Sequence, residues 1–327
     1  MNLSDLRVTS FGGGHGLAVT LESLRPITEH ITAVVTVADN GGSSGRLREE
    51  FNYLPPGDIR MALAALCADT EWGRSWADIL QYRFSSNGPL NNHAVGNLLL
   101  TALWNRDGDY VEGIERVASL LQLKGRVLPM STTPLEIAGD FSMNEGEPLV
   151  EVCGQVQVAT ARGSIQSLHL IPDNPPLTTQ VYEALENTDW ITLGPGSWFS
   201  SVMPHIVARE SAQAIINSTA KKIVIFNVPE EKFNSSGAPI GEYAGSSLLD
   251  HWEFLIKHAP DFAIDYAVVD KGSISTLGLP VESFEKLIAR NGGKLIIEDL
   301  ADTLQKTRHD SKKLTSLFSS IFSSELI

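Results

Sequence analysis

The hydrophobic positions of the first hundred residues alternate between short apolar runs and helical stripes. Residues 6–11 and 31–38 form two such runs, and the second is β-branched and nearly unbroken. Such a run is typical of a strand buried on both faces of a parallel sheet. Between them, Leu17, Leu21 and Leu24 recur at helical spacing. The pattern therefore predicts an α/β fold with a mostly parallel sheet.

Further helices are predicted before residue 124. Asp58 follows two prolines and a glycine, at a position suited to a helix N-cap. Another helix is predicted after His93, with a buried stripe of Val95, Leu98, Leu99, Ala102 and Leu103. A third is predicted over residues 110–123. Helices that alternate with strands in this way are expected to cover the faces of the sheet.

The pattern changes over residues 126–171. Short alternating stretches punctuated by Gly and Pro, such as residues 152–158, indicate strands and hairpins. The α/β alternation resumes with predicted strands at residues 190–193, 222–228, 266–269 and 295–297, and a final helix is predicted from Asp310. We therefore predict a single domain over residues 1–327, with a β-rich excursion at about residues 126–171.

The composition restricts the classes of partner. The 327 residues are 43% hydrophobic and 20% charged, as in a globular protein with a large core. A formal net charge of −14 argues against nucleic acid or an anionic membrane, because both require a basic face. Cys67 and Cys153 lack metal-ligand spacing and are predicted core residues. Without a signal sequence or a run of roughly 20 apolar residues, the chain is expected to be cytoplasmic.

Three predicted strands end in glycine-rich turns that open helices. The turns are Gly12-Gly13-Gly14-His15-Gly16, Gly41-Gly42-Ser43-Ser44-Gly45 and Gly194-Pro195-Gly196-Ser197. Glycine permits close backbone approach, so N–H groups and a helix N-terminus can bind an anion together. In an open α/β sheet, ligands bind outside the carboxyl ends of the strands. Three such turns on one rim predict a nucleotide or another phosphorylated ligand.

The spacing within the turns bears on the reaction. The first turn is not GxGxxG, and none carries the lysine and hydroxyl of a P-loop, so neither NAD chemistry nor Walker-type ATP hydrolysis is indicated. The second turn does satisfy GxSxG, which leaves an esterase-like nucleophile elbow at Ser43 as an alternative. Asp39 and Asn40 stand between the strand and this motif, which disfavours the elbow.

Two carboxylates accompany the turns. Asp39, at the end of the second strand, is placed to bind a ribose hydroxyl. Asp39 and Asp58 could instead share Mg²⁺, which commonly takes one or two carboxylates plus substrate phosphates. Both are therefore candidate catalytic and metal-binding residues, although helix capping alone would explain Asp58.

Arginines and amides near the turns are candidate ligand contacts. A guanidinium suits phosphate oxygens, so Arg46 and Arg60 are the preferred clamps. Arg48 is expected to be a solvated helix residue that pairs with Glu49 or Glu50. His15 and His93 stand at predicted helix starts, and Asn92 and Asn97 could read a base or ribose. Of these, Asn97 is the hardest to explain structurally, because Asn is unfavourable inside a helix.

The glycine turns and their neighbours resemble the motifs of a known family. In chain order they are Phe11 to Leu17, Val37 to Arg46, Pro55-Pro56-Gly57-Asp58-Ile59-Arg60, Gln81-Tyr82-Arg83-Phe84, His93 with Gly96-Asn97-Leu98, and Gly194-Pro195-Gly196-Ser197. Their order and spacing are similar to those of the gluconeogenesis factor family (YvcK type). That family lies in the CofD-like superfamily, whose enzymes are 2-phospho-L-lactate transferases.

The resemblance implies a Rossmann-like three-layer α/β/α core and a homodimer. It also implies a nucleotide-sugar-binding factor, with UDP-N-acetylglucosamine as the favoured ligand, needed for cell shape and growth on gluconeogenic carbon sources. The alternative is a Mg²⁺-dependent transferase that moves a phospho-lactyl group from a guanosine diphosphate donor to a flavin-like alcohol. Asp39 and Asp58 match the acidic motif positions of the family, and residues 12–16 and 41–44 match its loops.

Two departures from the family pattern favour binding over catalysis. Many members carry a second Asp where this chain has Asn40, which removes a charge from any metal site. The Ser-Gly pair that often precedes the histidine is here Asn91-Asn92. We therefore predict that the glycine turns, Arg46 and Arg60 hold a diphosphate. Asp39 and Asn92 are then expected to contact ribose or base.

Overall fold

A parallel sheet forms the centre of the molecule. The computed structural model of the chain describes residues 2–143, 146–161, 163–228, 232–233, 239–240 and 246–326. Within them, seven parallel strands are ordered β12-β11-β8-β7-β1-β2-β3. They are β1 (Val8–Gly12), β2 (Ile31–Val35), β3 (Arg126–Pro129), β7 (Trp190–Leu193), β8 (Lys221–Ile225), β11 (Tyr266–Asp270) and β12 (Lys294–Glu298). The predicted parallel sheet is confirmed.

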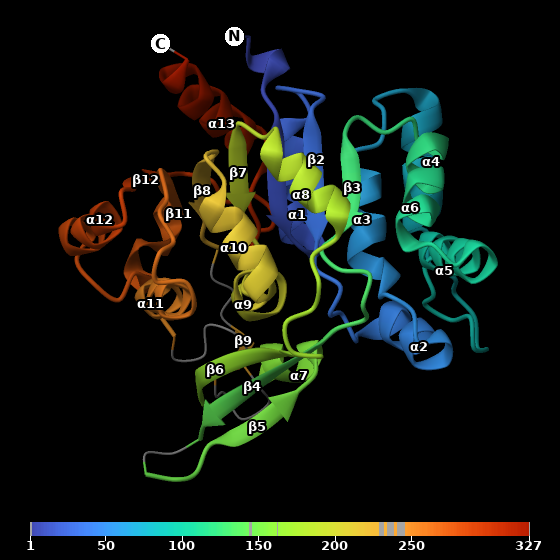
Figure 1. Cartoon of the computed structure of the whole chain (residues 1–327), viewed down its shortest axis with the longest axis horizontal. Coiled ribbons are helices and arrows are strands. Elements are labelled where there is room, and N and C mark those ends of the chain that lie inside the picture. Colours follow the sequence, from blue (N-terminus) through green and yellow to red (C-terminus); the bar gives the residue numbers. More distant parts are fainter. Residues whose placement is uncertain are drawn as a thin grey trace.

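Helices cover both faces of this sheet (Figure 1). On one face lie α1 (Gly14–Leu24), α3 (Pro56–Ala65) and α13 (Ser311–Glu325), and on the other α8 (Thr179–Glu186) and α10 (Arg209–Asn217). Leu17, Leu21 and Leu24 of α1 are buried, as their spacing predicts. The core is therefore the three-layer α/β/α arrangement that the resemblance implies.

The remaining described elements surround this core. They are α2 (Gly42–Phe51), α4 (Glu71–Gln81), α5 (Val95–Asp107), α6 (Tyr110–Leu120), α9 (Pro204–Val207), α11 (Leu248–His258), α12 (Val281–Arg290), η1 (Leu3–Asp5), η2 (Trp198–Val202), η3 (Lys271–Thr276), β9 (Lys232–Phe233) and β10 (Pro239–Ile240). None of the described helices combines the length and apolar character that crossing a bilayer would need.

The topology brings the glycine turns to one edge. The chain runs from β1 outward through β2 to β3 and later returns to place β7 on the other side of β1. Phe11 of β1 pairs with both Val34 of β2 and Leu193 of β7. The turns after these three strands therefore meet at the carboxyl edge, where the direction of strand addition reverses and ligands of such folds bind.

A separate antiparallel sheet lies beyond this edge, at the bottom of Figure 1. Its strands are β4 (Glu136–Ser142), β5 (Val150–Cys153) and β6 (Ser164–Ile171), in the order β5-β4-β6. The predicted β-rich excursion exists, but its predicted start at residue 126 is wrong, because β3 belongs to the main sheet. The predicted strand over residues 152–158 is also wrong: Gly154, with φ of 101°, ends β5, and α7 (Gln155–Thr160) follows.

Local predictions fail where buried polar groups override the apolar pattern. Asp58 is not an N-cap: Pro55 occupies that position, and Asp58 is the third residue of α3. In α5, the predicted apolar stripe is half-buried or exposed. The buried face instead consists of Gly96, Asn97, Leu100, Thr101 and Trp104. Cys67 is buried as predicted, but Cys153 is exposed on β5.

Candidate functional site

The first and third glycine turns touch each other. A Cβ added to Gly16 would lie 2.1 Å from the Pro195 carbonyl oxygen, so only glycine permits this approach. The buried Thr20 hydroxyl also lies 3.2 Å from the Gly194 carbonyl oxygen and donates to it. The turns after β1 and β7 therefore form one continuous surface at the edge of the sheet.

The first turn also contacts the acidic pair. The carboxylate of Asp58 accepts a hydrogen bond from the Gly14 N–H, and a Cβ on Gly13 would lie 2.6 Å from Asp58 Oδ2. Asp39 Oδ1 accepts from the Gly41 N–H at 2.8 Å, and the Asp39 carboxylate also forms a hydrogen bond with the Ser44 hydroxyl. The two predicted carboxylates are thus held against the first and second turns respectively.

Two cavities adjoin the first turn and the acidic pair. The smaller, of about 250 Å³, is lined by Asp39, residues 41–44, Asp58, Arg60, Arg83, Asn92 and Asn97. The larger, of about 640 Å³, is lined by residues 13–16, residues 195–197, Asn227, Arg308 and Lys312. His15 belongs to the larger cavity, yet its pKa is lowered by burial and then by Arg308, Arg60 and Arg83. The charges of both cavities therefore act on one side chain.

The acidic pair is electrostatically strained. Asp58 is 9% exposed, and its Oδ2 has no hydrogen-bond partner. Burial raises the pKa of Asp58 to about 7, and the neighbouring charge of Asp39 adds to the effect. Burial likewise raises the pKa of Asp39. Two carboxyl groups that share a buried site resist joint ionisation unless a cation joins them.

Arg60 is fixed at one end and unpaired at the other. Its Nε donates to Asn97 Oδ1 at 2.9 Å, while its buried Nη1 has no partner. Burial lowers the pKa of Arg60 to about 10, and the charge of Arg83 contributes. Because a guanidinium remains protonated at such a pKa, Arg60 carries an incompletely satisfied positive charge beside the smaller cavity.

The hydrogen bonds of Asn97 explain why an asparagine lies inside α5. Besides accepting from Arg60, it donates from Nδ2 to Ser43 Oγ at 3.0 Å. The Ser43 oxygen lies 3.0 Å from His93 Nδ1, so the hydroxyl proton can point to the ring. Burial lowers the pKa of His93, which favours the neutral ring that accepts it. The amide therefore joins Arg60, Ser43 and His93 in one network.

The geometry around Ser43 does not support a nucleophile elbow. An elbow is a sharp turn from strand to helix that exposes the serine hydroxyl. Here β2 ends at Val35, residues 36–42 intervene, and Ser43 is the second residue of α2. Ser43 is only 3% exposed. Its hydroxyl is thus a buried member of the Asn97 network.

Three further residues near the second turn line neither of these two cavities but a separate one of about 680 Å³, namely Asn40, Arg46 and Arg48. Arg46 donates to the carbonyl oxygens of Pro89 and Asn91, at 3.0 and 2.8 Å, and so holds a loop rather than facing the acidic pair. The Asn40 side chain turns to α7. Arg48 is half-buried, with Glu136 and Asp39 as its charged neighbours, so the prediction that it is solvated and pairs with Glu49 or Glu50 is wrong.

Several residues of the site were not predicted from the sequence. Arg83 lines the smaller cavity although it is exposed just after the end of α4. Arg308 and Lys312 come from the start of α13 and the segment before it, far from any glycine turn. Buried His205 bonds through Nε2 to the Gly12 carbonyl oxygen at 3.2 Å and so supports the first turn from below. Positive charge in an acidic chain was a signal for the two arginines and Lys312, and Arg83 also lies in one of the family motifs.

The acidic pair suits a hard cation. Carboxylate oxygens are the ligands that Mg²⁺ prefers, and the unpartnered Asp58 Oδ2 has capacity for one. Among the described residues, no third His, Cys, Asp or Glu completes a metal cluster. Asp39 and Asp58 would therefore hold Mg²⁺ together with ligand phosphates and water, which is how this ion is commonly bound.

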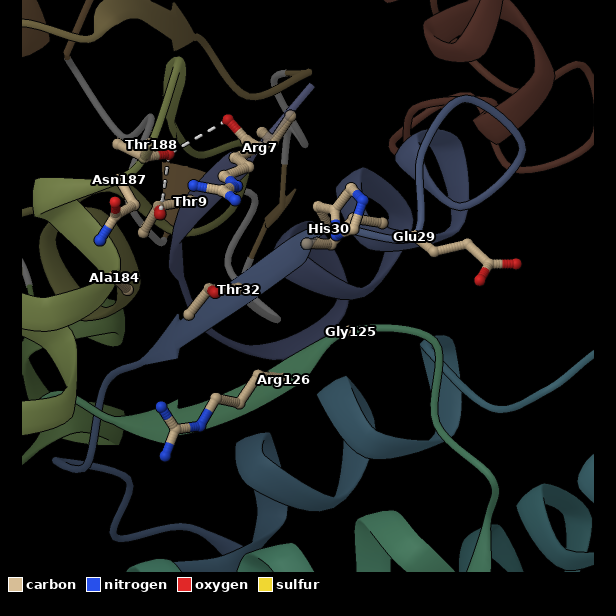
Figure 2. Close-up of a pocket in the computed structure, with 12 residues that line it drawn as sticks. Arg7, Thr9, Glu29, His30, Thr32, Gly125, Arg126, Ala184, Asn187 and Thr188 are labelled. Carbon is tan, nitrogen blue, oxygen red and sulfur yellow. Dashed lines mark hydrogen bonds between the residues drawn. The ribbon is translucent and has the colours of Figure 1, made fainter. Parts of the chain in front are cut away.

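A further cavity, of about 300 Å³, lies at the opposite edge of the sheet (Figure 2). Arg7, Thr32 and Arg126 line it, and the hydroxyl of Thr9 is already bonded to that of Thr188 at 3.0 Å. At this edge the covering helices present their C-termini, which carry partial negative charge. It has neither a glycine turn nor an acidic pair, so the carboxyl edge remains the candidate site.

The fold and the site define a class that comparison with known proteins identifies. The sequence profile of the CofD family, described as 2-phospho-L-lactate transferase CofD, matches residues 8–308. A solved structure of a UPF0052 family member from Bacillus halodurans superimposes with a TM-score of 0.79 at 31% identity, covering 96% of this chain and 98% of that one.

Curated relatives narrow the class. A relative from Mycobacterium tuberculosis is 43% identical over 265 residues, which cover 80% of this chain and 75% of the relative. The gluconeogenesis factor of Listeria monocytogenes is 36% identical over 279 residues, covering 84% of this chain and 79% of that protein. The chain belongs to the gluconeogenesis factor family within the CofD-like proteins.

Proposed function

We propose that this protein is a cytoplasmic, homodimeric factor that binds a nucleotide sugar, with UDP-N-acetylglucosamine as the favoured ligand. Through that ligand it would support cell shape and growth on gluconeogenic carbon sources. The observation that carries the proposal is a pair of cavities: Gly13 and Gly14 line the larger, and Asp58, which accepts from the Gly14 N–H, lines the smaller. A divided site of this kind suits two chemical groups joined by a diphosphate.

The charges of the site support a diphosphate ligand. Both cavities contain cations beside carboxylates. Arg60 and Arg83 line the smaller one with Asp39 and Asp58, and Arg308 and Lys312 line the larger one with Glu22, Asp302 and Asp310. Backbone N–H groups at the start of α1 add partial positive charge. The arginines and the lysine of the two cavities can neutralise phosphate charge, and the larger cavity, of about 640 Å³, has room for a nucleoside or sugar.

Calorimetry with UDP-N-acetylglucosamine tests the proposal. We expect saturable binding, with UMP and N-acetylglucosamine 1-phosphate each binding far more weakly, because each fills one part of the site. A comparison of GDP with UDP, which differ only in the base, is the matched control for recognition of the base. Undetectable binding of every uridine and guanosine diphosphate ligand, with and without Mg²⁺, would overturn the proposal.

A second candidate function is a Mg²⁺-dependent transferase of the 2-phospho-L-lactate type. The paired, partly unsatisfied Asp39 and Asp58 favour it. Bound Mg²⁺ would supply neutralisation of phosphate charge during group transfer. Incubation with nucleoside diphosphate donors and alcohol acceptors, with Mg²⁺ or chelator, decides between the two. Turnover that Asp39→Asn abolishes without loss of folding supports the enzyme, whereas binding that persists in chelator without turnover supports the factor.

A further inference from the structure

Helix α7 connects the antiparallel sheet to both parts of the site. It is tied to that sheet because the Gly154 N–H donates to the Ile137 carbonyl of β4 at 2.7 Å. Val158 of α7 is 4% exposed and joins the hydrophobic core. At this same N-terminal end, Gln155 is the first residue of α7 and lines the larger cavity. The start of this short helix therefore contacts both the sheet at the bottom of Figure 1 and the ligand site.

The Asn40 side chain joins α7 to the second glycine turn. Its Oδ1 accepts from the Val156 N–H at 3.1 Å, and its Nδ2 donates to Gln157 Oε1 at 3.1 Å. A backbone N–H can only donate, so the amide orientation of Asn40 is determined. Gly154 leaves room for this contact, since a Cβ there would lie 2.4 Å from Asn40 Nδ2.

Movement at this contact cannot stay local. Asn40 lies between Asp39 and Gly41, whose N–H is bonded to the Asp39 carboxylate at 2.8 Å. A Cβ on Gly45 would lie 2.1 Å from the Asn40 carbonyl oxygen, so the start of α2 is packed directly on this residue. A shift of α7 would therefore move the Asp39 carboxylate and the turn that carries Ser43.

We propose that Asn40 is a positioning residue, and that its contact with Val156 and Gln157 couples the antiparallel sheet to ligand occupancy. The coupling to ligand depends on the proposed function, whereas the contact between Asn40 and α7 does not depend on it. Bound ligand orders the second turn and Gln155, and α7 transmits that order to β4, β5 and β6. Residue 40 thus serves the site from the side that faces α7, away from the acidic cavity.

The test uses Asn40→Asp, Gln157→Glu and the double variant. The Asn40→Asp variant keeps an oxygen that accepts from the Val156 N–H, and the Gln157 amide can turn to donate to the new carboxylate. The Gln157→Glu variant keeps an oxygen that accepts from Asn40 Nδ2. The double variant places two carboxylates against each other, which repel. Each single variant is therefore a matched control for the pair.

Amide hydrogen exchange without ligand measures the contact. We expect exchange over residues 154–161 and 39–45 to be about tenfold faster in the double variant, and within about threefold of wild type in each single variant. Equal exchange in all four proteins would overturn the contact, whatever the protein binds.

Exchange with UDP-N-acetylglucosamine measures the coupling. In wild type we expect ligand to slow exchange in the described parts of residues 136–171. In the double variant that protection should be lost and the dissociation constant should rise about tenfold, with an unchanged far-UV spectrum as the folding control. Ligand binding without protection of the sheet in wild type overturns the coupling alone. Absence of ligand binding overturns the proposed function instead, and the ligand-free exchange still tests the contact.

Discussion

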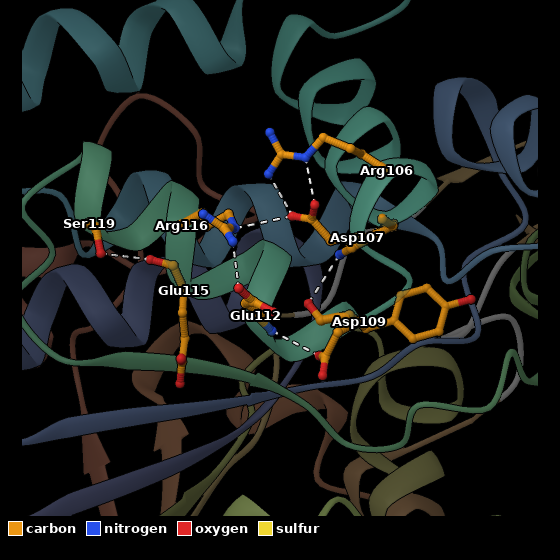
Figure 3. A network of polar contacts seen from close by, with 9 residues as sticks. Arg106, Asp107, Asp109, Glu112, Glu115, Arg116 and Ser119 are labelled. Carbon is orange, nitrogen blue, oxygen red and sulfur yellow. Dashed lines mark hydrogen bonds and ion pairs between the residues drawn. The ribbon is translucent and has the colours of Figure 1, made fainter.

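Two groups of charged residues differ in how completely their members are paired. The rim cluster, formed by Asp39, Asp58 and Arg60, is largely buried, and both Asp58 Oδ2 and Arg60 Nη1 lack partners. The surface network of α5 and α6 is paired in the open (Figure 3). There Arg116 contacts Glu112 at 2.5 Å and Asp107 at 3.1 Å, and Arg106 contacts Asp107 at 2.5 Å.

This difference indicates which charged groups of the protein can still bind a ligand. Burial of an unpaired charge costs free energy that the folded chain must offset elsewhere. Exposed ion pairs contribute little, because water and salt screen them. In the rim cluster this free-energy cost is not offset by a local partner. Its unpaired atoms belong to residues that line the smaller cavity. The surface network, all of whose members the structure describes, has no comparable buried and unsatisfied atom to offer a ligand.

Removal of one guanidinium from each group should give the largest contrast. We expect Arg60→Ala to weaken binding of UDP-N-acetylglucosamine by about 100-fold, because a charge-assisted bond to phosphate is lost. Arg106→Ala, an arginine of 60% side-chain exposure, is the matched control and should stay within about twofold. Calorimetry measures both, with thermal melting as the folding check. Equal losses in the two variants would contradict the distinction between the groups.

Asp58→Asn should reveal the cost of the buried carboxylate. The pKa of Asp58 in the folded protein, about 7, lies above its ordinary value of 3.8. The folded state therefore binds the proton more tightly than the unfolded state between these values, and stability falls as pH rises from about 4 to 7. Between pH 5 and 8 we expect ionisation of this residue to cost wild type about 3 kcal/mol of unfolding free energy.

Urea unfolding in chelator at pH 5 and pH 8 measures that cost. The variant should lose less stability than wild type over this interval, since its amide does not ionise. An identical pH dependence in the two proteins would show that Asp58 is already compensated in the ligand-free state. Addition of Mg²⁺ at pH 8 should stabilise wild type more than the variant if the pair holds the ion.

Asn97→Ala should have a smaller effect, because it acts through Arg60. Loss of the 2.9 Å bond to Arg60 Nε frees the guanidinium to turn, and we expect binding about tenfold weaker. Asn97→Asp, which still accepts from Arg60, should recover part of the loss. Failure of the aspartate to recover any affinity, in a protein with a normal melting curve, would argue against a positioning role.

The sequence predicted those parts of the molecule that local patterns determine. The strand over residues 190–193 was predicted at its observed bounds, and the three glycine turns do meet at one edge. Apolar periodicity and glycine-rich turns are local signals that predict the strands and their ends. Parallel topology then brings the turns that follow neighbouring strands to the same edge of the sheet. The orientation of Arg46 was not predictable, because it depends on carbonyl groups of a loop more than forty positions away.

Polar residues in helices caused the other failures. The stripe predicted for α5 followed its leucines, yet Asn97 is buried because Ser43 and Arg60 supply its partners. Those partners lie on other helices and leave no trace in the α5 sequence. Arg308 approaches the site only through the packing of α13 on α1. Contacts of this kind could not be predicted from the sequence, because the partner residues lie on other elements.

The surface network should yield the smallest effect. Arg116→Ala removes contacts with Glu112 and Asp107, but the arginine side chain is 49% exposed. Exposed pairs of this kind contribute little to stability, so we expect the melting temperature to change by less than about 1 °C at physiological salt. Differential scanning calorimetry at low and high salt measures it. A large drop in melting temperature that does not depend on salt would show that this network stabilises the fold. Its contrast with the rim cluster would then be lost.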